Sequence, residues 1–279
     1  MNVNTPQEEV IVLRPSRGWS ALNLRDLWVY RELIYFLTWR DIKVRYKQTV
    51  LGAGWAILQP LVNMVVLSVI FGNFAKMDTE GIPRPVFTFA ALLPWGLFSK
   101  ALNDAGRSML ANRNMITKIY FPRLIIPLAS VLGGVVDFLI QFGILLLMML
   151  YYGYPPTLNI WALPLFLLLA LMTALGFGLW LSALNVLYRD VNYILPFLTQ
   201  LWLLLTPVGY SSSVVPEQWR IVYALNPMVG VVEGFRWALL GAETTPGPQM
   251  ILSVVISTVL LVTGMYYFRR MERTFADMV

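Results

Sequence analysis

An acidic and an amide side chain stand one helical turn apart inside a long apolar stretch, at Asp137 and Gln141. This spacing places both on one face of a helix, and a carboxylate at membrane depth marks a functional site by default. Gly133 and Gly134 precede them and permit close approach of a neighbouring helix. No second carboxylate or histidine stands beside Asp137 to form a proton relay. We therefore favour a lone Asp137 that is neutral and hydrogen-bonded within a helix bundle.

Other kinds of site chemistry are missing from the chain. It has no histidine and no cysteine, which removes the commonest general base, the commonest metal ligand and every thiolate. It also lacks the phosphate-binding loop that ends in Gly-Lys-Ser or Gly-Lys-Thr, and the His-Glu-x-x-His motif. We therefore expect no catalytic residue, no metal and no cofactor in this chain, and no binding of ATP through such a loop.

The composition indicates a protein that uses lipid as its solvent. Hydrophobic residues make up 58% of the chain and charged residues only 13%, too few charges to cover a soluble fold. A membrane-spanning helix needs about 20 mostly apolar residues. Six segments meet this requirement and predict an all-α integral membrane fold: 50–75, 86–102, 124–152, 160–187, 191–210 and 250–268.

The positions of the Lys and Arg residues orient these crossings. The first 26 residues are polar and contain no signal-peptide core, which predicts a cytoplasmic N-terminus. Six crossings then place most of the 21 basic residues inside, as the positive-inside rule requires. We expect both termini to be cytoplasmic. The chain then divides into a cytoplasmic N-terminal part, 1–50, and a transmembrane domain, 51–279.

The stretch 214–240, between the fifth and sixth crossings, is interrupted by prolines and charges. Two short re-entrant helices suit it better than a seventh crossing, which would put the basic C-terminus outside. Asn226 can cap a helix that has Pro227 at its first position, and Glu233 can pair with Arg236 three residues later. These residues suggest either a gate near the outer surface or a simple fixation of the re-entrant hairpin.

A basic helix is predicted before the first crossing, over 27–48. Its apolar residues recur at helical spacing, and its cations include Arg40, Lys43, Arg45 and Lys47, as in an amphipathic helix that lies in the membrane interface. This helix is either a plain topology anchor or the border of a lateral entrance for a lipid-anchored substrate. In the second case its cations would attract a pyrophosphate group.

Two inner loops are candidate contacts for a partner protein. The segment 107–123, which includes Arg113, mixes basic and apolar residues and predicts a short amphipathic helix that docks into a partner's groove. The alternative is a helix that lies on the membrane surface. The tight loop at Arg189 and Asp190 is either a second partner contact or an ordinary pair of charged helix ends.

Aromatic side chains are dense, with 10 Trp, 13 Tyr and 15 Phe. Those at the ends of crossings are expected to form interfacial belts. Deeper rings would offer flat apolar faces over which sugars can slide without binding tightly. Deep positions include Trp55, Phe71, Phe197 and Trp202. The sequence leaves open which of them face a lumen and which face lipid.

Four blocks of the sequence resemble the permeases of polysaccharide-export ABC transporters. They are TWRDIKVRYKQTVLGAGWAILQPL at 38–61, MITKIYFPRLIIPLASV at 115–131, LNVLYRDVNYILPFLTQLWLLLTPVGYS at 184–211 and LNPMVGVVEGFRWALLG at 225–241. They occur in the family's order over nearly the whole chain from about residue 25. Each block alone is a weak signal, whereas four in register are a strong one.

The resemblance implies a fold, partners and a cargo. Such permeases have six crossings per subunit, an amphipathic N-terminal helix and two re-entrant helices before the last crossing. They work in the bacterial inner membrane as homodimers with two separate ATPase subunits, which bind the ATP and Mg²⁺, and no nucleic acid takes part. Their cargo is a polymer on undecaprenyl pyrophosphate, namely O-antigen, capsule polysaccharide or teichoic acid. O-antigen is our first candidate.

The resemblance also implies roles for single positions. Met115, Ile116 and Tyr120 fall in or beside the cytoplasmic element that couples the permease to the ATPase. The four cations of the helix at 27–48 border the lipid portal. The first and fifth crossings line the channel, which points to the four deep aromatic residues as channel-lining candidates.

Two other functions compete with this one. An ion-coupled flippase would need a titratable site inside the membrane, for which Asp137 is the only good candidate. A membrane-bound enzyme acting on lipid-linked sugars would need acidic or metal-binding residues at the membrane face. Asp78, Glu80 and Asp104 are scattered, and no His or Cys supports them, so we rank the enzyme last.

Overall fold

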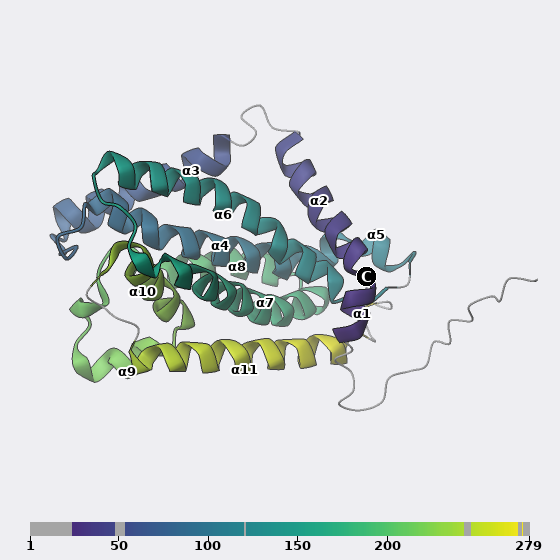
Figure 1. Ribbon diagram of the computed structural model, residues 1–279. Coiled ribbons are helices and arrows are strands. Elements are labelled where there is room, and N and C mark those ends of the chain that lie inside the picture. Colours follow the sequence, from purple (N-terminus) through teal and green to yellow (C-terminus); the bar gives the residue numbers. More distant parts are fainter. Residues whose placement is uncertain (1–23, 48–53, 120, 243–246, 273–274, 276–279) are drawn as a thin grey trace, which may run out of the picture.

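The chain is described by a computed structural model over residues 24–47, 54–119, 121–242, 247–272 and 275. These residues form helices and turns and contain no strand. Figure 1 shows the long helices packed in one bundle, with α2 and α5 at one end of it. The α-helices are α1 (Leu24–Val29), α2 (Arg31–Lys47), α3 (Gly54–Val69), α4 (Arg84–Ala111), α5 (Arg113–Ile116), α6 (Ile125–Tyr151), α7 (Leu163–Leu187), α8 (Val191–Leu204), α9 (Arg220–Ala224), α10 (Pro227–Leu240) and α11 (Pro248–Met271). Shorter helical turns span Ile70–Phe74, Leu158–Ala162, Ser212–Val214 and Glu217–Trp219.

Among the described residues, five segments are long and apolar enough to cross a membrane: Gly54–Phe74, Arg84–Ala111, Ile125–Tyr151, Leu158–Leu187 and Met250–Met271. They correspond to five of the six predicted crossings. At the remaining position stands α8, whose 14 residues rise about 21 Å, less than a hydrocarbon core of about 30 Å. The helix ends shortly before Pro207, because proline disfavours helical geometry at the residue before it. The sixth crossing therefore stays a prediction.

The central helix of the bundle is α4, which packs against α3, α6, α7, α8 and α10. Small residues let its neighbours approach closely. A Cβ added to Gly178 of α7 would lie only 2.6 Å from the Cβ of Ala105 in α4. Small residues at such contacts are typical of helix packing in membranes, where close approach gains dispersion energy.

Main-chain contact joins α7 to α11. A Cβ added to Gly176 would lie 2.7 Å from the Leu261 nitrogen, and one added to Gly264 would overlap the Gly176 carbonyl oxygen. A change of rotamer cannot relieve an overlap with the backbone. The two glycines therefore set the distance between these helices.

The predicted interface helix is α2, and its apolar stripe packs on the bundle. Leu33, Ile34 and Leu37 contact an apolar cluster formed by residues of α5, α6, α7 and α11, and Leu37 is only 1% exposed. The opposite face of α2 exposes Tyr35 and Phe36. This helix therefore has one face on α6 and one face away from the subunit.

Two short helices, α9 and α10, occupy the stretch that we predict to be re-entrant. The start of α10 confirms the predicted cap, because the Asn226 side chain accepts a hydrogen bond from the Met228 nitrogen at 3.0 Å and Pro227 is its first residue. The helix ends at Gly241, whose φ of 66° is the left-handed conformation that favours glycine. That these helices enter and leave the membrane on one side stays a prediction.

We expect Gly176→Ala to destabilise the bundle by about 1–3 kcal/mol, because the added methyl group overlaps the main chain of α11. The matched control is Gly143→Ala in α6, where an added Cβ has no atom within 4 Å. Glycine to alanine inside a helix stabilises by about 0.5–1 kcal/mol. Thermal unfolding of the purified protein in detergent measures both. Equal melting temperatures for the two variants would contradict the main-chain contact.

Candidate functional site

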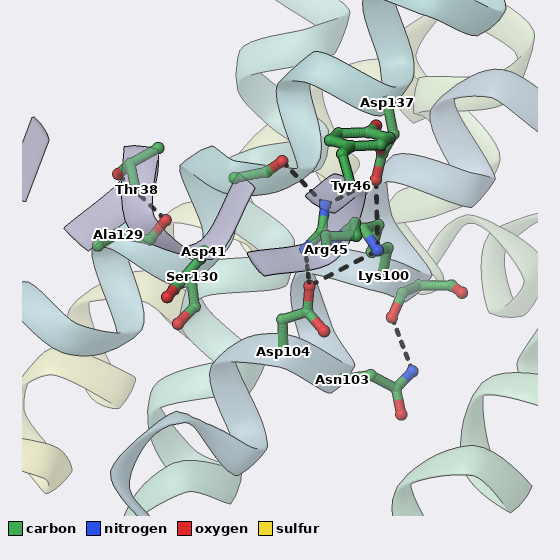
Figure 2. Close-up of polar contacts among 12 residues, drawn as sticks. Thr38, Asp41, Arg45, Tyr46, Lys100, Asn103, Asp104, Ala129, Ser130 and Asp137 are labelled. Atoms are coloured by element: carbon green, nitrogen blue, oxygen red, sulfur yellow. Dashed lines mark hydrogen bonds and ion pairs between the residues drawn. The ribbon is translucent and has the colours of Figure 1, made fainter. Parts of the chain in front are cut away.

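Four charged side chains from α2, α4 and α6 meet in an ion cluster, shown in Figure 2: Arg45, Lys100, Asp104 and Asp137. Arg45 contacts both carboxylates, with Nη1 2.8 Å from Asp137 Oδ2 and Nη2 3.2 Å from Asp104 Oδ2. Lys100 Nζ lies 3.3 Å from the same Asp137 oxygen and 3.9 Å from Asp104 Oδ2. Two cations and two carboxylates balance, so the ion cluster has no net formal charge.

Asp137 has the most buried side chain of the ion cluster, at 8% exposure. The Tyr46 hydroxyl donates to its other oxygen, Oδ1, and Arg45 Nη1 also donates to the Gly133 carbonyl oxygen at 3.3 Å. The prediction that Asp137 is hydrogen-bonded within the bundle is confirmed. The prediction that it stands alone as a neutral side chain is wrong, because α2 brings Arg45 and Tyr46 to it and α4 brings Lys100.

Hydroxyl groups strengthen the attachment of α2. Burial, together with the hydrogen bond to Asp137, raises the pKa of Tyr46 to about 12, so the phenol keeps its proton at neutral pH and remains a donor. Nearer the start of α2, Thr38 Oγ1 donates to the Ala129 carbonyl oxygen at 3.3 Å. The helix is therefore held to α6 by ion pairs and hydroxyls as well as by its apolar stripe.

A cleft of about 510 Å³ opens beside the ion cluster, and residues of α2, α3, α4 and α6 line it. Trp55, Gln59 and Asn63 line the cleft from α3, spaced four residues apart and thus on one face of the helix. Gln141 lines it from α6 and donates through Nε2 to the Ala56 carbonyl oxygen at 3.3 Å. The cleft therefore combines amide groups, aromatic rings and ion pairs.

The four cations predicted to border a lipid portal divide between two sides of α2. Arg45 turns into the ion cluster. Arg40, Lys43 and Lys47 line a second pocket of about 300 Å³, here called the α2 pocket. Arg40 is paired there with Asp41 at 2.8 Å, whereas neither lysine has an ion-pair partner in the described part of the chain.

The predicted coupling residues do not all face outward. Met115 and Ile116 pack into the apolar cluster beneath α2, and Ile116 is only 6% exposed, because burial of an apolar side chain is favourable. Tyr120 lies outside the described residues. Arg113 and Ile119 of the same segment are exposed, Ile119 to 61%. Of the predicted coupling residues in this segment, Arg113 is therefore exposed, and Ile119 is a further exposed residue beside it.

The second predicted contact, Arg189 and Asp190, lies exposed in the turn between α7 and α8. Polar side chains fix this turn: Asn192 Nδ2 donates to Asn185 Oδ1 at 2.9 Å, and Arg107 Nη2 of α4 donates to the Asn192 carbonyl oxygen at 3.2 Å. The turn is therefore tied to the end of α4 that leads into α5, and the two predicted contacts lie at the same end of the bundle.

Arg236 is buried and does not pair with Glu233, so that prediction is wrong. Its guanidinium donates to the carbonyl oxygens of Val208, at 2.7 Å, and Tyr210, at 3.0 Å, and lies 3.6 Å from the centre of the Phe87 ring. Both carbonyl groups belong to turns after α8 and lack a helical donor, which Arg236 supplies. Glu233 Oε1 is buried with no hydrogen-bond partner among the described residues.

The four candidate channel aromatics fall into two pairs. Trp55 and Phe197 are 53% and 61% exposed, on α3 and α8. Trp202 packs inside the bundle, where its Nε1 donates to Asn226 Oδ1 at 2.8 Å. Phe71 packs against a tyrosine ring of the segment after α8, with ring centroids 5.8 Å apart. The exposed pair is therefore the better placed to meet a cargo or a second subunit.

Sequence reasoning missed the ion cluster although part of its signal was present. Lys100 and Asp104 stand four residues apart, a spacing that pairs opposite charges on a helix. Arg45, however, is 92 positions from Asp137 and 59 from Asp104. No local pattern relates residues that far apart, so only the packing of α2 on the bundle reveals their contact.

We expect Asp137→Asn to destabilise the folded protein by about 1–3 kcal/mol, because Arg45 and Lys100 lose the carboxylate that they share. The matched control, Asp104→Asn, should cost less, since that side chain is 35% exposed against 8% for Asp137. Thermal unfolding in detergent measures both variants. A larger loss of stability from Asp104→Asn would contradict the central place of Asp137 in the cluster.

Known proteins resemble this chain over most of its length. The model of the family described as ABC-2 type transporter matches residues 32–240. The chain is 29% identical to the O-antigen export system permease protein RfbA of Myxococcus xanthus over 92% of this chain and 98% of that protein. It is 28% identical to the RfbA permease of Klebsiella pneumoniae over 89% and 95% of the two chains. It is 25% identical to the polysialic acid transport protein KpsM of Escherichia coli over 84% and 91%.

The family match begins in α2 and ends at the last residue of α10. It therefore includes the ion cluster, the cleft, the coupling segment and the buried Arg236. The relatives align over nearly their whole length. The chain belongs to the ABC-2 type transporter family and is the membrane permease subunit of an ABC exporter.

Proposed function

We propose that this permease exports a polysaccharide carried on undecaprenyl pyrophosphate across the bacterial inner membrane, with O-antigen as the first candidate cargo. The observation that carries the proposal is the likeness to two O-antigen export permeases over 89–92% of this chain. Capsule polysaccharide is the second candidate, favoured by the weaker likeness to KpsM. Teichoic acid is the third.

The proposed topology has six crossings, with both termini in the cytoplasm and 214–240 as a re-entrant pair of short helices. The distribution of Lys and Arg supports this orientation. The predicted crossing at 191–210 is longer than α8 itself, which spans Val191–Leu204. The N-terminal part, 1–50, and the transmembrane domain, 51–279, keep their predicted roles in this arrangement.

The proposed assembly contains a second copy of this chain and two ATPase subunits, which hold the ATP and Mg²⁺. Exposed apolar faces on two helices support a homodimer: in α3 only Met64 is buried, and α8 exposes Phe197 and Leu201. Two such faces from each copy could enclose a channel at the dimer interface. Trp55 and Phe197 would line it, which gives their exposed rings a contact with the sugar polymer.

The proposed portal for the lipid carrier is the α2 pocket. Lys43 and Lys47 supply charges there that no described carboxylate neutralises, and Phe36 and Val44 supply an apolar wall. Ammonium groups beside an apolar wall suit a pyrophosphate attached to a polyprenyl chain. Arg40 is available in part, because Asp41 shares its guanidinium.

An ion-coupled flippase is the main alternative function, and the contacts of Asp137 disfavour it. Its only good candidate for a titratable site was Asp137. In the structure that carboxylate contacts Arg45 and Lys100, and its second oxygen accepts from Tyr46. Such a carboxylate serves to fasten α2 rather than to bind and release a coupling ion.

The proposed coupling surface consists of the exposed residues at the α5 end of the bundle. Arg113 and Ile119 lie after α4, and Arg189 and Asp190 lie in the adjacent turn. An exposed isoleucine among charges fits an anchor that enters a partner's groove. Because Arg107 ties the turn to α4, a displacement of either contact by the ATPase would be transmitted to α4.

We expect Ile119→Asp to lower transport-coupled ATP hydrolysis at least tenfold while the protein still inserts into the membrane, because the charge blocks docking of the ATPase. The matched control is Leu158→Asp, a 95% exposed position outside the coupling surface, which should leave hydrolysis unchanged. Ile116→Asp should instead reduce the amount of folded protein, since that side chain is buried. Normal coupling in the Ile119 variant would refute the coupling role.

Depletion of the permease in cells should cause long lipid-linked glycan to accumulate on the cytoplasmic side while surface glycan falls, because synthesis continues and export stops. Extraction of the undecaprenyl-linked pool, followed by analysis of the polymer length and sugar composition, measures this and identifies the cargo. Re-expression of the chain is the control. Normal surface glycan with no accumulated lipid-linked polymer would overturn the proposed cargo and leave only the permease assignment.

A further inference from the structure

The face of α3 that lines the cleft carries two amide side chains, Gln59 and Asn63, although α3 belongs to a segment that can cross a membrane. Both residues are exposed, and neither makes a hydrogen bond within the described part of the chain. An amide in hydrocarbon without a partner costs several kcal/mol. The cleft therefore has to be filled by water, by a polar ligand or by polar groups of a second copy.

The walls of the cleft have the chemistry that binds a sugar. Gln59, Asn63 and Gln141 offer amide donors and acceptors, and the Asp137 carboxylate borders the same space. Trp55 and Trp95 line it with aromatic rings, whose flat apolar faces suit the C–H faces of a sugar ring. The volume of about 510 Å³ lies in the range of small-molecule sites.

The charge of the cleft restricts which sugar it can hold. Arg45 and Lys100 are the cations that line it. Each forms ion pairs with Asp137, which also lines the cleft, and with Asp104 of the ion cluster, so the two positive charges are balanced. An anionic sugar would meet no free cation and would lie beside a carboxylate, which disfavours it. An uncharged sugar can donate its hydroxyl groups to that carboxylate and accept from the amides.

We infer that the cleft between α3, α4 and α6 binds an uncharged saccharide unit, and that the balanced ion cluster selects against anionic sugars. The inference rests on the proposed export of a glycan and names the class of sugar that is exported. It favours a neutral polymer over polysialic acid or another polyanion. Two faces of α2 then have different functions. Arg45 belongs to the ion cluster beside the cleft, whereas the unpaired lysines of the α2 pocket remain free for a phosphate group.

The chain has no cysteine, so a single introduced thiol reports only on the position where it is placed. We would introduce Asn63→Cys into the full-length protein in lipid vesicles and measure the rate of alkylation by iodoacetamide. Only a thiolate reacts, and a thiol ionises in water rather than in lipid. Val259→Cys is the matched control, because Val259 is 53% exposed on α11, outside the cleft. We expect alkylation at position 63 to be at least tenfold faster.

Sugar probes then test selectivity. Maltotriose, which is uncharged, should slow alkylation at position 63 severalfold, whereas sialyllactose at the same concentration should not. Adding Asp104→Asn leaves one positive charge in the cluster and should let sialyllactose protect the thiol as well. Adding Lys100→Gln to that variant restores neutrality and should abolish this protection. The variant with both Asp104→Asn and Lys100→Gln thus has the net charge of the original cluster and controls for the loss of the Asp104 carboxylate.

Three results would overturn the inference. They are equal alkylation at positions 63 and 259, protection by neither sugar, and protection that does not change with the charge of the cluster. None of these results affects the glycan-accumulation experiment, which tests export itself. Failure of the cleft as a sugar site is therefore distinguishable from failure of the proposed function.

Discussion

The carboxylate of Asp137 is the contact on which the arrangement of the N-terminal half depends. It joins α6 to Arg45 and Tyr46 of α2 and to Lys100 of α4. A carboxylate buried in an apolar bundle is unfavourable unless it is paired, and here each of its oxygens has a partner. Together with the apolar stripe of α2, this contact fixes which faces of α2 meet the cleft and the α2 pocket.

The cations of this subunit differ in whether they have a partner inside the protein. Arg45 points inward to its carboxylate partners, and the buried Arg236 is held by main-chain oxygens. The lysines of α2 remain unpaired among the described residues and face the α2 pocket. In a permease this division matters, because a buried unpaired charge costs stability while an exposed one remains free to attract a ligand.

Periodicity and composition predict the helices and their ends better than their faces. Long apolar runs locate five crossings, and the pair Asn226–Pro227 predicts the start of α10, because both signals are local. Ile116 looked like a docking residue but is buried, since α2 folds back over it. Arg236 had a carboxylate three residues away but binds carbonyl oxygens of a distant turn. Such choices depend on which segments pack together, and a single sequence does not contain that information in any local pattern.

The burial of α4 sets an order for biogenesis. This helix is synthesised second among the described segments that can cross a membrane, yet much of its surface is covered by α7 and α10, which follow it in the chain. The Arg236 side chain reaches the Phe87 carbonyl oxygen across 149 positions of sequence. During translation α4 must therefore reside in the bilayer without these partners, with its alanine- and glycine-rich surface against lipid or the insertion machinery. The bundle becomes complete only when the last fifth of the polypeptide has left the ribosome.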